Sequence, residues 1–197
     1  VYASTYYEGP KAFARHTSGR PQEETMAIIV QKLTGEEYGD YYYPAISGVG
    51  QSHNFYPIPP MKREDGIASI ALGLGKTVVE GERALRFCPK HPTCMPQFST
   101  VDDTLSNAQR YFYALKIRSY PEGLTFDHYS NLERREVDEA EGESPVQALA
   151  STYIPEEHRI RDSGYLKGPK VLTFAQVLKY NTFPLPSLVS DFLDLGR

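Results

Sequence analysis

The sequence predicts an α+β fold with a mixed, mainly antiparallel sheet and flanking helices. Short runs of β-branched and aromatic residues, which are typical of strands, are spread along the chain between turn-forming segments. Helical segments are mixed with these runs, without the strict alternation of strands and helices that a parallel α/β protein shows. The 197 residues, 40% of them hydrophobic and 23% charged, are ample for a sizeable core in an ordinary globular protein.

The first half of the chain is predicted to contain four strands. The run from Met26 to Leu33 is apolar and rich in β-branched residues, so it is predicted to be a buried strand. The next strand contains Pro44, which favours an edge position or a bulge. The predicted elements are a helix and loop over 1–20, strands over 26–33, 41–49, 66–72 and 83–88, a proline-rich loop over 53–63, and a short helix over 77–80.

The second half follows a loop rich in Pro, Thr and Ser over 89–104. An amphipathic helix is predicted over 185–195, with Gly196 as its natural stop. The other expected elements are a strand over 110–117, a solvated acidic segment over 133–145, an apolar segment of undecided type over 146–153, and a strand or helix start over 171–177.

The charge and hydropathy of the chain argue against nucleic acid and membrane as binding partners. The net charge is −4, and no Lys/Arg stripe is present, so the sequence lacks the basic surface that a nucleic-acid-binding protein needs. No apolar run approaches the roughly 20 residues that span a bilayer. We therefore expect a cytoplasmic protein that binds neither nucleic acid nor membrane.

Gly75-Lys76-Thr77 matches the end of a phosphate-binding P-loop. The full motif needs another glycine five residues earlier, where this chain has Ile70. The P-loop interpretation is therefore disfavoured, and Gly73 and Gly75 are expected to form a tight turn from strand to helix. Strain at Gly75 is expected for any residue other than glycine.

Cys88-x-x-His91-x-x-Cys94 has soft ligands at a spacing that a zinc site could use. Tetrahedral structural zinc needs four ligands, and the chain has no further cysteine. His53 or His16 could in principle be the fourth ligand, but no metal is assigned. The same sequence is also explained by a buried cysteine at a strand end that is followed by exposed loop residues. The sequence leaves open whether Cys88 and Cys94 form a disulfide bond.

The order of several segments resembles the nucleotide-binding domain of pyruvate phosphate dikinase and phosphoenolpyruvate synthase. The matching segments are Val30-Gln31-Lys32-Leu33, then Ser47-Gly48-Val49, then Ala71-Leu72-Gly73-Leu74-Gly75-x-x-Val78-Val79-x-Gly81 followed by a strand. The resemblance implies an ATP-grasp fold, in which ATP lies between two α+β subdomains. Residues 1–100 would then form a sheet subdomain with the adenine-side strand, and 101–197 would continue the same domain up to the catalytic strand.

The resemblance also implies a site. Gln31 would lie on the ATP side, and the backbone of Lys32 and Leu33 would form a hinge beside the adenine. No catalytic residue is assigned, because the family's phosphate-binding cations and Mg²⁺ ligands have no counterpart in this chain. The intact parent would use ATP and Mg²⁺ to phosphorylate a carrier histidine, with its remaining domains as partners. The 197 residues alone are expected to bind ATP more weakly than about 1 mM.

A second hypothesis is a non-catalytic α+β module that binds a protein partner. The chain has 15 tyrosines and no tryptophan, and tyrosine combines an apolar body with a polar tip. Tyr41, Tyr42 and Tyr43 cannot all face one side of a strand, so at least one is expected in the core and one at or near the surface.

Overall fold

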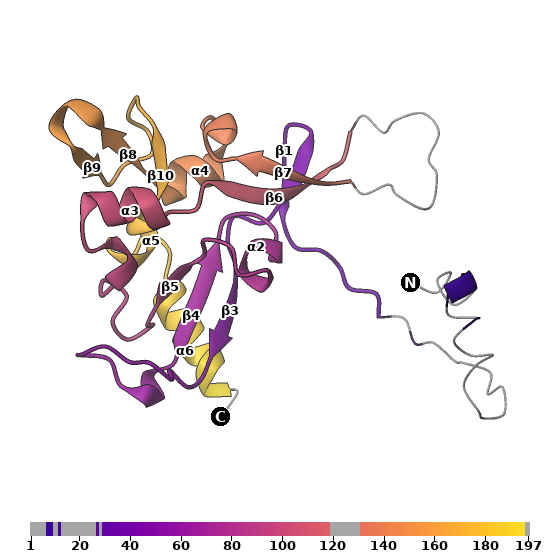
Figure 1. The fold of residues 1–197 in the computed structure, drawn as a ribbon, viewed down its shortest axis with the longest axis horizontal. Coiled ribbons are helices and arrows are strands. Elements are labelled where there is room, and N and C mark those ends of the chain that lie inside the picture. The colour runs from indigo at the N-terminus through magenta and orange to yellow at the C-terminus, as the bar shows by residue number, and fades with distance from the viewer. Residues whose placement is uncertain (1–6, 10–11, 13–26, 28, 119–130, 196–197) are drawn as a thin grey trace. The chain divides into compact units, whose positions relative to one another are not determined.

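The computed structural model describes residues 7–9, 12, 27, 29–118 and 131–195. It divides into two units, residues 1–33 and 34–197, and each unit is described by itself. Figure 1 shows the helices and strands of the second unit. Most of the helix predicted over 1–20 falls outside the described residues.

The largest sheet of the second unit has four antiparallel strands in the order β1-β2-β6-β7. A two-residue turn with Gly39 at φ +60° joins the first two strands, as tight hairpins require. The sheet takes strands from both sides of residue 100. Its strands are β1 (Glu36–Tyr38), β2 (Tyr41–Tyr43), β6 (Tyr111–Lys116) and β7 (Leu132–Glu136).

The remaining described strands form two smaller antiparallel sheets, in the orders β3-β4-β5 and β10-β8-β9. The first contains β3 (Ser47–Gln51), β4 (Ile67–Ala71) and β5 (Leu85–Phe87), and the second contains β8 (Ala150–Ile154), β9 (Arg159–Arg161) and β10 (Lys170–Leu172). The α-helices are α2 (Lys76–Val79), α3 (Val101–Asn107), α4 (Ser144–Leu149), α5 (Ala175–Leu178) and α6 (Leu185–Leu195), and the 3₁₀ helices are η2 (Arg63–Asp65), η3 (Pro96–Phe98), η4 (Asp138–Ala140) and η5 (Pro155–Glu157).

The core joins these sheets through large side chains. Tyr43 of β2, Phe87 of β5, Phe112 of β6 and Phe174, which immediately precedes α5, are almost completely buried. Tyr43 packs on Phe112 with ring centroids 4.9 Å apart. The α+β fold class is therefore confirmed, and so is the placement of at least one tyrosine of 41–43 in the core, with Tyr41 and Tyr42 only partly buried.

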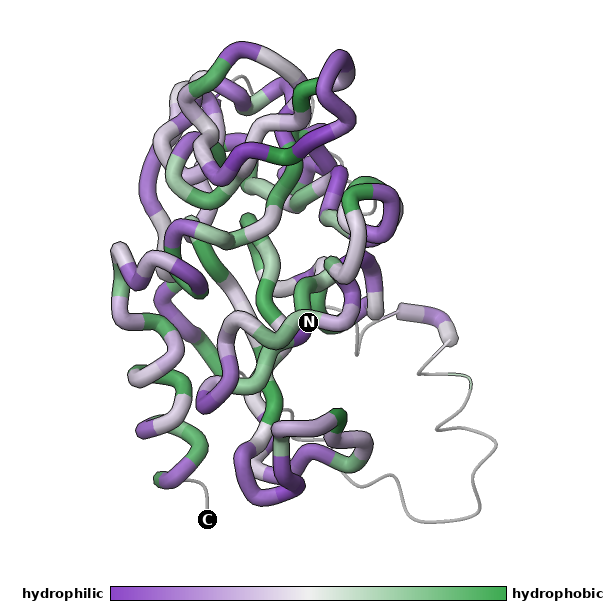
Figure 2. Tube along the Cα trace, turned by 90° about the vertical axis from the view of Figure 1, so that its left-hand side faces the viewer, coloured by the Kyte–Doolittle hydropathy of each residue, from purple (hydrophilic) through white to green (hydrophobic). Residues whose placement is uncertain are grey.

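Several predicted elements are confirmed. The strands expected over 66–72, 83–88 and 110–117 are β4, β5 and β6, and the short helix expected behind the glycines is α2. The amphipathic helix over 185–195 is α6, along which hydrophobic and hydrophilic residues alternate (Figure 2). Its Leu193 is buried, as an apolar stripe facing the core requires.

The buried strand predicted over 26–33 is wrong for the residues that are described. Residues 29–33 form no strand, and Ile29 and Val30 are 84% and 88% exposed. Apolar character alone favours a strand, but a strand also needs a neighbouring strand for its backbone groups, and residues 29–33 belong to none of the strand pairs among the described residues.

Other predictions were too coarse. The run 41–49 is split at Pro44 into β2 and β3, which belong to different sheets, because proline supplies no backbone donor. The segment 133–145 is not a solvated excursion, since it contains β7 and η4 with buried Arg135 and Ala140. The segments of undecided type, 146–153 and 171–177, each hold both helix and strand residues.

Candidate functional site

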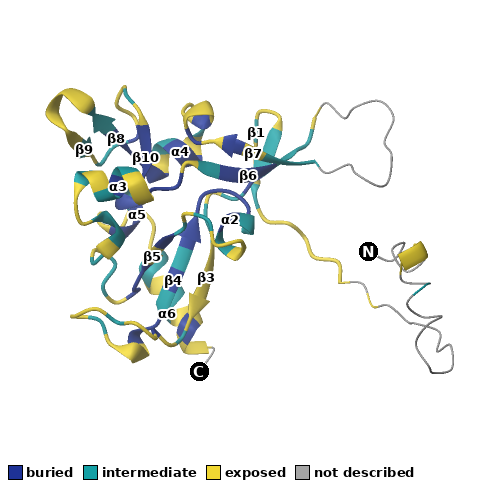
Figure 3. Ribbon diagram, viewed as in Figure 1, coloured by how far each residue is buried: buried dark blue, intermediate teal, exposed yellow. Residues whose placement is uncertain are grey.

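The predicted adenine-side residues lie next to one another in the first unit. Gln31, Lys32 and Leu33 are exposed and lie in an irregular segment, not in a strand (Figure 3). Backbone N–H and C=O groups are the donors and acceptors that an adenine edge requires. Their assignment to a nucleotide site stays a prediction.

The glycine-rich turn connects β4 to α2. Gly73 has a φ of +84°, its N–H donates to Pro44 O at 3.2 Å, and Leu74 N–H donates to Tyr113 O at 2.8 Å. Gly75 has an ordinary helical φ of −60°, and a Cβ added there would meet no atom within 4 Å. The expectation that Gly75 needs glycine is therefore wrong, and Gly73 is the position that does.

The threonine of Gly-Lys-Thr faces the interior. Thr77 is completely buried, and its Oγ1 has no hydrogen-bond partner among the described residues. Lys76 forms an ion pair with Glu80 at 3.5 Å and lies 4.7 Å from the Tyr113 ring centroid. A P-loop places this hydroxyl on the magnesium ion of the nucleotide. The buried hydroxyl does not fit that role.

Tyr113 links the turn to the four-stranded sheet. Its hydroxyl donates to Glu82 Oε1 at 2.9 Å, and this bond to a carboxylate raises the pKa of Tyr113 above its ordinary value. The phenol therefore stays protonated at neutral pH, and it keeps the Glu82 carboxylate beside the glycine-rich turn.

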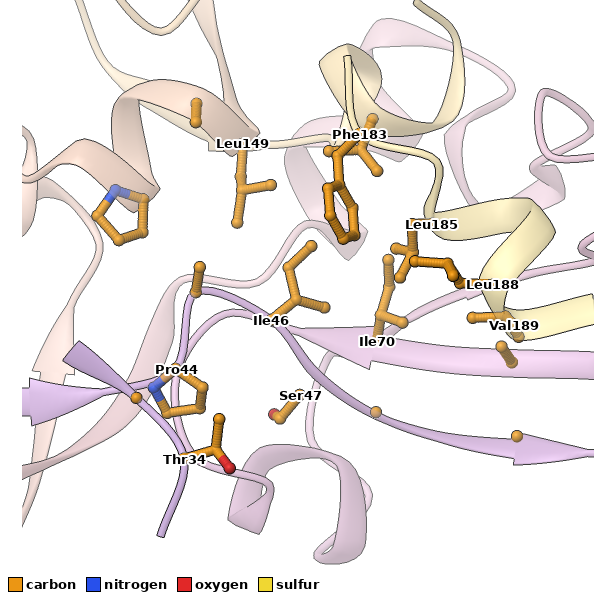
Figure 4. A pocket seen from close by; sticks show the side chains of 18 of the residues that line it. Thr34, Pro44, Ile46, Ser47, Ile70, Leu149, Phe183, Leu185, Leu188 and Val189 are labelled. Atoms are coloured by element: carbon orange, nitrogen blue, oxygen red, sulfur yellow. The ribbon is translucent and has the colours of Figure 1, made fainter. Parts of the chain in front are cut away.

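An apolar groove of about 800 Å³ lies between β3, β4 and α6. Figure 4 shows Phe183 and Leu149 facing Ile46, and Leu185 of α6 close to Ile70. Its volume falls within the range of pockets that hold small ligands, which is roughly 300–1,000 Å³. The groove is lined by residues 34–36, 38, 44–50, 68, 70, 145, 148, 149, 177, 182, 183, 185, 188, 189 and 192.

Ser47 gives the apolar groove a polar group. Its side-chain oxygen is buried and has no hydrogen-bond partner among the described residues. A buried hydroxyl without a partner costs about 1–3 kcal/mol. Because the oxygen is closed to solvent, the Ser47 side chain must change rotamer before a ligand in the groove can form a hydrogen bond with it and recover this cost. Ser47 belongs to the Ser-Gly-Val segment that carries the resemblance.

The possible zinc ligands are not gathered into a metal site. Cys88 is completely buried just after β5, which confirms a buried cysteine at a strand end, and both cysteines are free thiols. His91 Nε2 lies 3.9 Å from Asp65 Oδ2. Among the described residues, no group of three or more His, Cys, Asp or Glu side chains could hold a metal ion.

Asp65 provides a pH-dependent contribution to stability. The Lys62 N–H donates to its buried carboxylate at 2.7 Å, and this bond, with the Lys90 ammonium at 3.1 Å, lowers the pKa of Asp65 below the usual 3.8. Replacing Asp65 by asparagine is expected to lower the free energy of unfolding by about 1 kcal/mol at pH 7.

A depressed folded-state pKa stabilises the fold above the unfolded value, and this stabilisation is lost as the pH falls through the folded value. The difference in the free energy of unfolding between Asp65→Asn and the unchanged protein should therefore shrink below pH 3.8. Urea denaturation at several pH values measures this difference. A difference that is the same at neutral and acidic pH would contradict this assignment.

The structure also gathers three arginines that the sequence analysis does not single out: Arg83, Arg110 and Arg134 line one pocket. They are far apart in the sequence and form no basic run, so no local signal could identify them. Only the fold brings them together.

Comparison of the chain with protein-family models, curated proteins and solved structures gives no match. In the described part of the chain, no helix combines the length and apolar character needed to cross a bilayer.

Proposed function

We propose that the chain is part of the ATP-binding domain of a dikinase-like phosphotransferase, and that the apolar groove receives the adenine. The observation that carries this proposal is the hydroxyl of Ser47, a groove-lining residue, which is buried and has no hydrogen-bond partner among the described residues. Adenine has a flat apolar body and polar edges, so it fits a pocket that is apolar with a few convergent polar groups.

The chain order around the groove supports the same proposal. Thr34 and Gly35 line the groove, and they directly follow Gln31, Lys32 and Leu33, the predicted hinge. The turn at Gly73 connects β4 to α2, and Gly73 has a positive φ. A strand-to-helix turn at these glycines, in place of a P-loop, is what the resemblance to the dikinase family implies.

In this proposal the chain binds the base, and the chemistry takes place elsewhere in the parent protein. Phosphoryl transfer needs positioned cations and metal ligands around the γ-phosphate. As the resemblance to the dikinase family implies, the proposal assigns Mg²⁺ and the carrier histidine to the intact parent protein and its remaining domains. The proposed compartment is the cytoplasm.

A titration with magnesium-ATP, followed by amide resonances in NMR, tests the proposal at the weak affinity expected. With ATP at about 10 mM, the largest shifts are expected at residues 34–35 and 47–50. Ser47→Ala should weaken binding about fivefold, the equivalent of one neutral hydrogen bond. Ser106→Ala, on the exposed face of α3, is the matched control and should bind as the unchanged protein does.

Two outcomes would overturn nucleotide binding in the groove. One is the absence of saturable shifts, and the other is a set of shifts that Ser47→Ala and Ser106→Ala leave equally unchanged. Either result would favour the second candidate, a protein-interaction module.

One observation favours that second candidate. Phe183, Leu188 and Phe192 line the groove and are 49%, 49% and 68% exposed, so its rim offers an apolar surface to a partner. The tyrosines of 41–43 do not contribute such a surface, because they are buried or half-buried in the sheet. The interaction module would therefore use this rim and not the Tyr-rich strand.

A further inference from the structure

A second pocket, which we call the arginine pocket, lies where β6 and β7 meet the loop before β5. It has a volume of about 350 Å³ and is lined by Glu82, Arg83, Gln109, Arg110, Tyr111 and Arg134. Arg83 comes from the loop, Arg110 immediately precedes β6, and Arg134 belongs to β7. Three arginines therefore line one small pocket in a chain whose net charge is −4.

These positive charges are poorly neutralised. Arg83 has no hydrogen-bond or ion-pair partner among the described residues, and Arg110 Nη2 makes only a 3.3 Å bond to Leu105 O. The single carboxylate in the lining, Glu82, already accepts a hydrogen bond from the Tyr113 hydroxyl. Glu136, opposite Tyr111 in the sheet, is not part of the lining.

The surroundings hold part of the arginine pocket in a fixed geometry. The Arg134 guanidinium stacks on the Tyr111 ring, with Cζ 3.9 Å from the centroid. The buried Gln109, another lining residue, accepts from Leu72 N–H and donates to Leu72 O and Tyr111 O, with distances between 2.8 and 3.0 Å. A stacked guanidinium loses little freedom when it binds an anion.

We propose that the arginine pocket binds a small phosphate-bearing anion. Guanidinium groups match phosphate oxygens with paired, charge-assisted hydrogen bonds. The volume is near the lower end of the range for ligand pockets, which suits inorganic phosphate or a small phosphate ester. The arginine pocket and the apolar groove share no lining residue, so this inference does not depend on the proposed adenine site.

Isothermal titration at low salt tests the proposal with two probes, inorganic phosphate and glycerol phosphate, to separate free phosphate from a phosphate ester. Arg83→Gln is expected to weaken binding of the preferred probe about tenfold or more, because it removes a charge-assisted contact. Arg63→Gln removes the same charge from an exposed position outside the arginine pocket, and it should leave the affinity unchanged.

Arg134→Lys separates recognition by a guanidinium from simple attraction by charge. Lysine keeps the charge but not the planar fork, so this variant should also bind more weakly than the unchanged protein. Equal affinities for Arg83→Gln and Arg63→Gln, or no binding of either probe by the unchanged protein, would overturn the proposal. Ser47→Ala should not affect phosphate binding, which keeps this test independent of the adenine site.

Discussion

Replacing Gly73 by alanine is expected to lower the free energy of unfolding by about 2–5 kcal/mol. The φ of +84° costs an L-residue roughly 1–2 kcal/mol. A Cβ at this position would also lie 2.7 Å from Tyr113 O and 2.9 Å from Phe112 Cδ2, and both atoms belong to the packed strand β6. Crowding of this kind in a core adds about 1–3 kcal/mol. Denaturation by urea at neutral pH measures the sum.

Gly75→Ala is the matched control for this prediction. At Gly75 the backbone is helical, with φ −60°, and an added Cβ meets no atom within 4 Å. The free energy of unfolding should therefore change by less than about 0.5 kcal/mol. If both variants were equally destabilised, or neither were, the assignment of the strained position of the turn to Gly73 would be wrong.

The elements that could be predicted from the sequence are those with a local signal. In α6 the apolar residues recur at helical spacing, and in β4 and β6 they form short runs between turn residues. The buried Cys88 at the end of β5 belongs to the same group. These features depend on neighbours along the chain, so no knowledge of the tertiary structure is needed.

Other features depend on residues far away in the sequence. Arg135 lies in a charge run that is typical of a solvated face, but in the structure it is 8% exposed. The aromatic residues that cover it, Tyr41 and Phe112, come from β2 and β6. No local pattern contains this pairing.

The candidate site also combines residues that have a local sequence signal with residues that only the tertiary structure brings together. Ser47 belongs to the Ser-Gly-Val segment that carries the resemblance, but the sequence assigned it no role in a site, because its buried hydroxyl and the apolar groove beside it depend on α6 and β4. The arginine pocket had no sequence signal, because its three arginines come from the loop before β5, the start of β6, and β7. Gln31, Lys32 and Leu33 were identified from the resemblance, and their role still awaits the ATP titration.

Replacing Arg135 by alanine is expected to lower the free energy of unfolding by about 3–5 kcal/mol, the range for removing one partner of a buried ion pair. Arg135 Nη1 donates to Glu143 Oε1 at 2.9 Å, and its Cζ lies 3.9 Å from the Tyr41 ring centroid. The side chains of Arg135 and Glu143 are 9% and 21% exposed. Without the guanidinium, the Glu143 carboxylate would be left largely buried without its cation.

Arg134→Ala is the matched control, since Arg134 is the preceding residue on β7 and is exposed. Its loss should cost less than about 1 kcal/mol, the value of an exposed cation–π contact. Chemical denaturation of both variants makes the comparison, and similar losses would show that Arg135 is not stabilised by a buried pair.

A double-mutant cycle with Glu143→Gln distinguishes the ion pair from the packing of Arg135. Tyr43 also donates a hydrogen bond to Glu143, and burial together with this bond raises the pKa of Tyr43, so the phenol stays a donor at neutral and moderately alkaline pH. Glutamine keeps an acceptor for Tyr43 and removes the charge. If the ion pair dominates, Arg135→Ala in the Glu143→Gln background should cost at least about 1 kcal/mol less than in the unchanged protein. If the losses in the free energy of unfolding caused by Arg135→Ala and Glu143→Gln simply add in the double variant, the stabilisation comes from packing of the guanidinium on Tyr41 and Phe112.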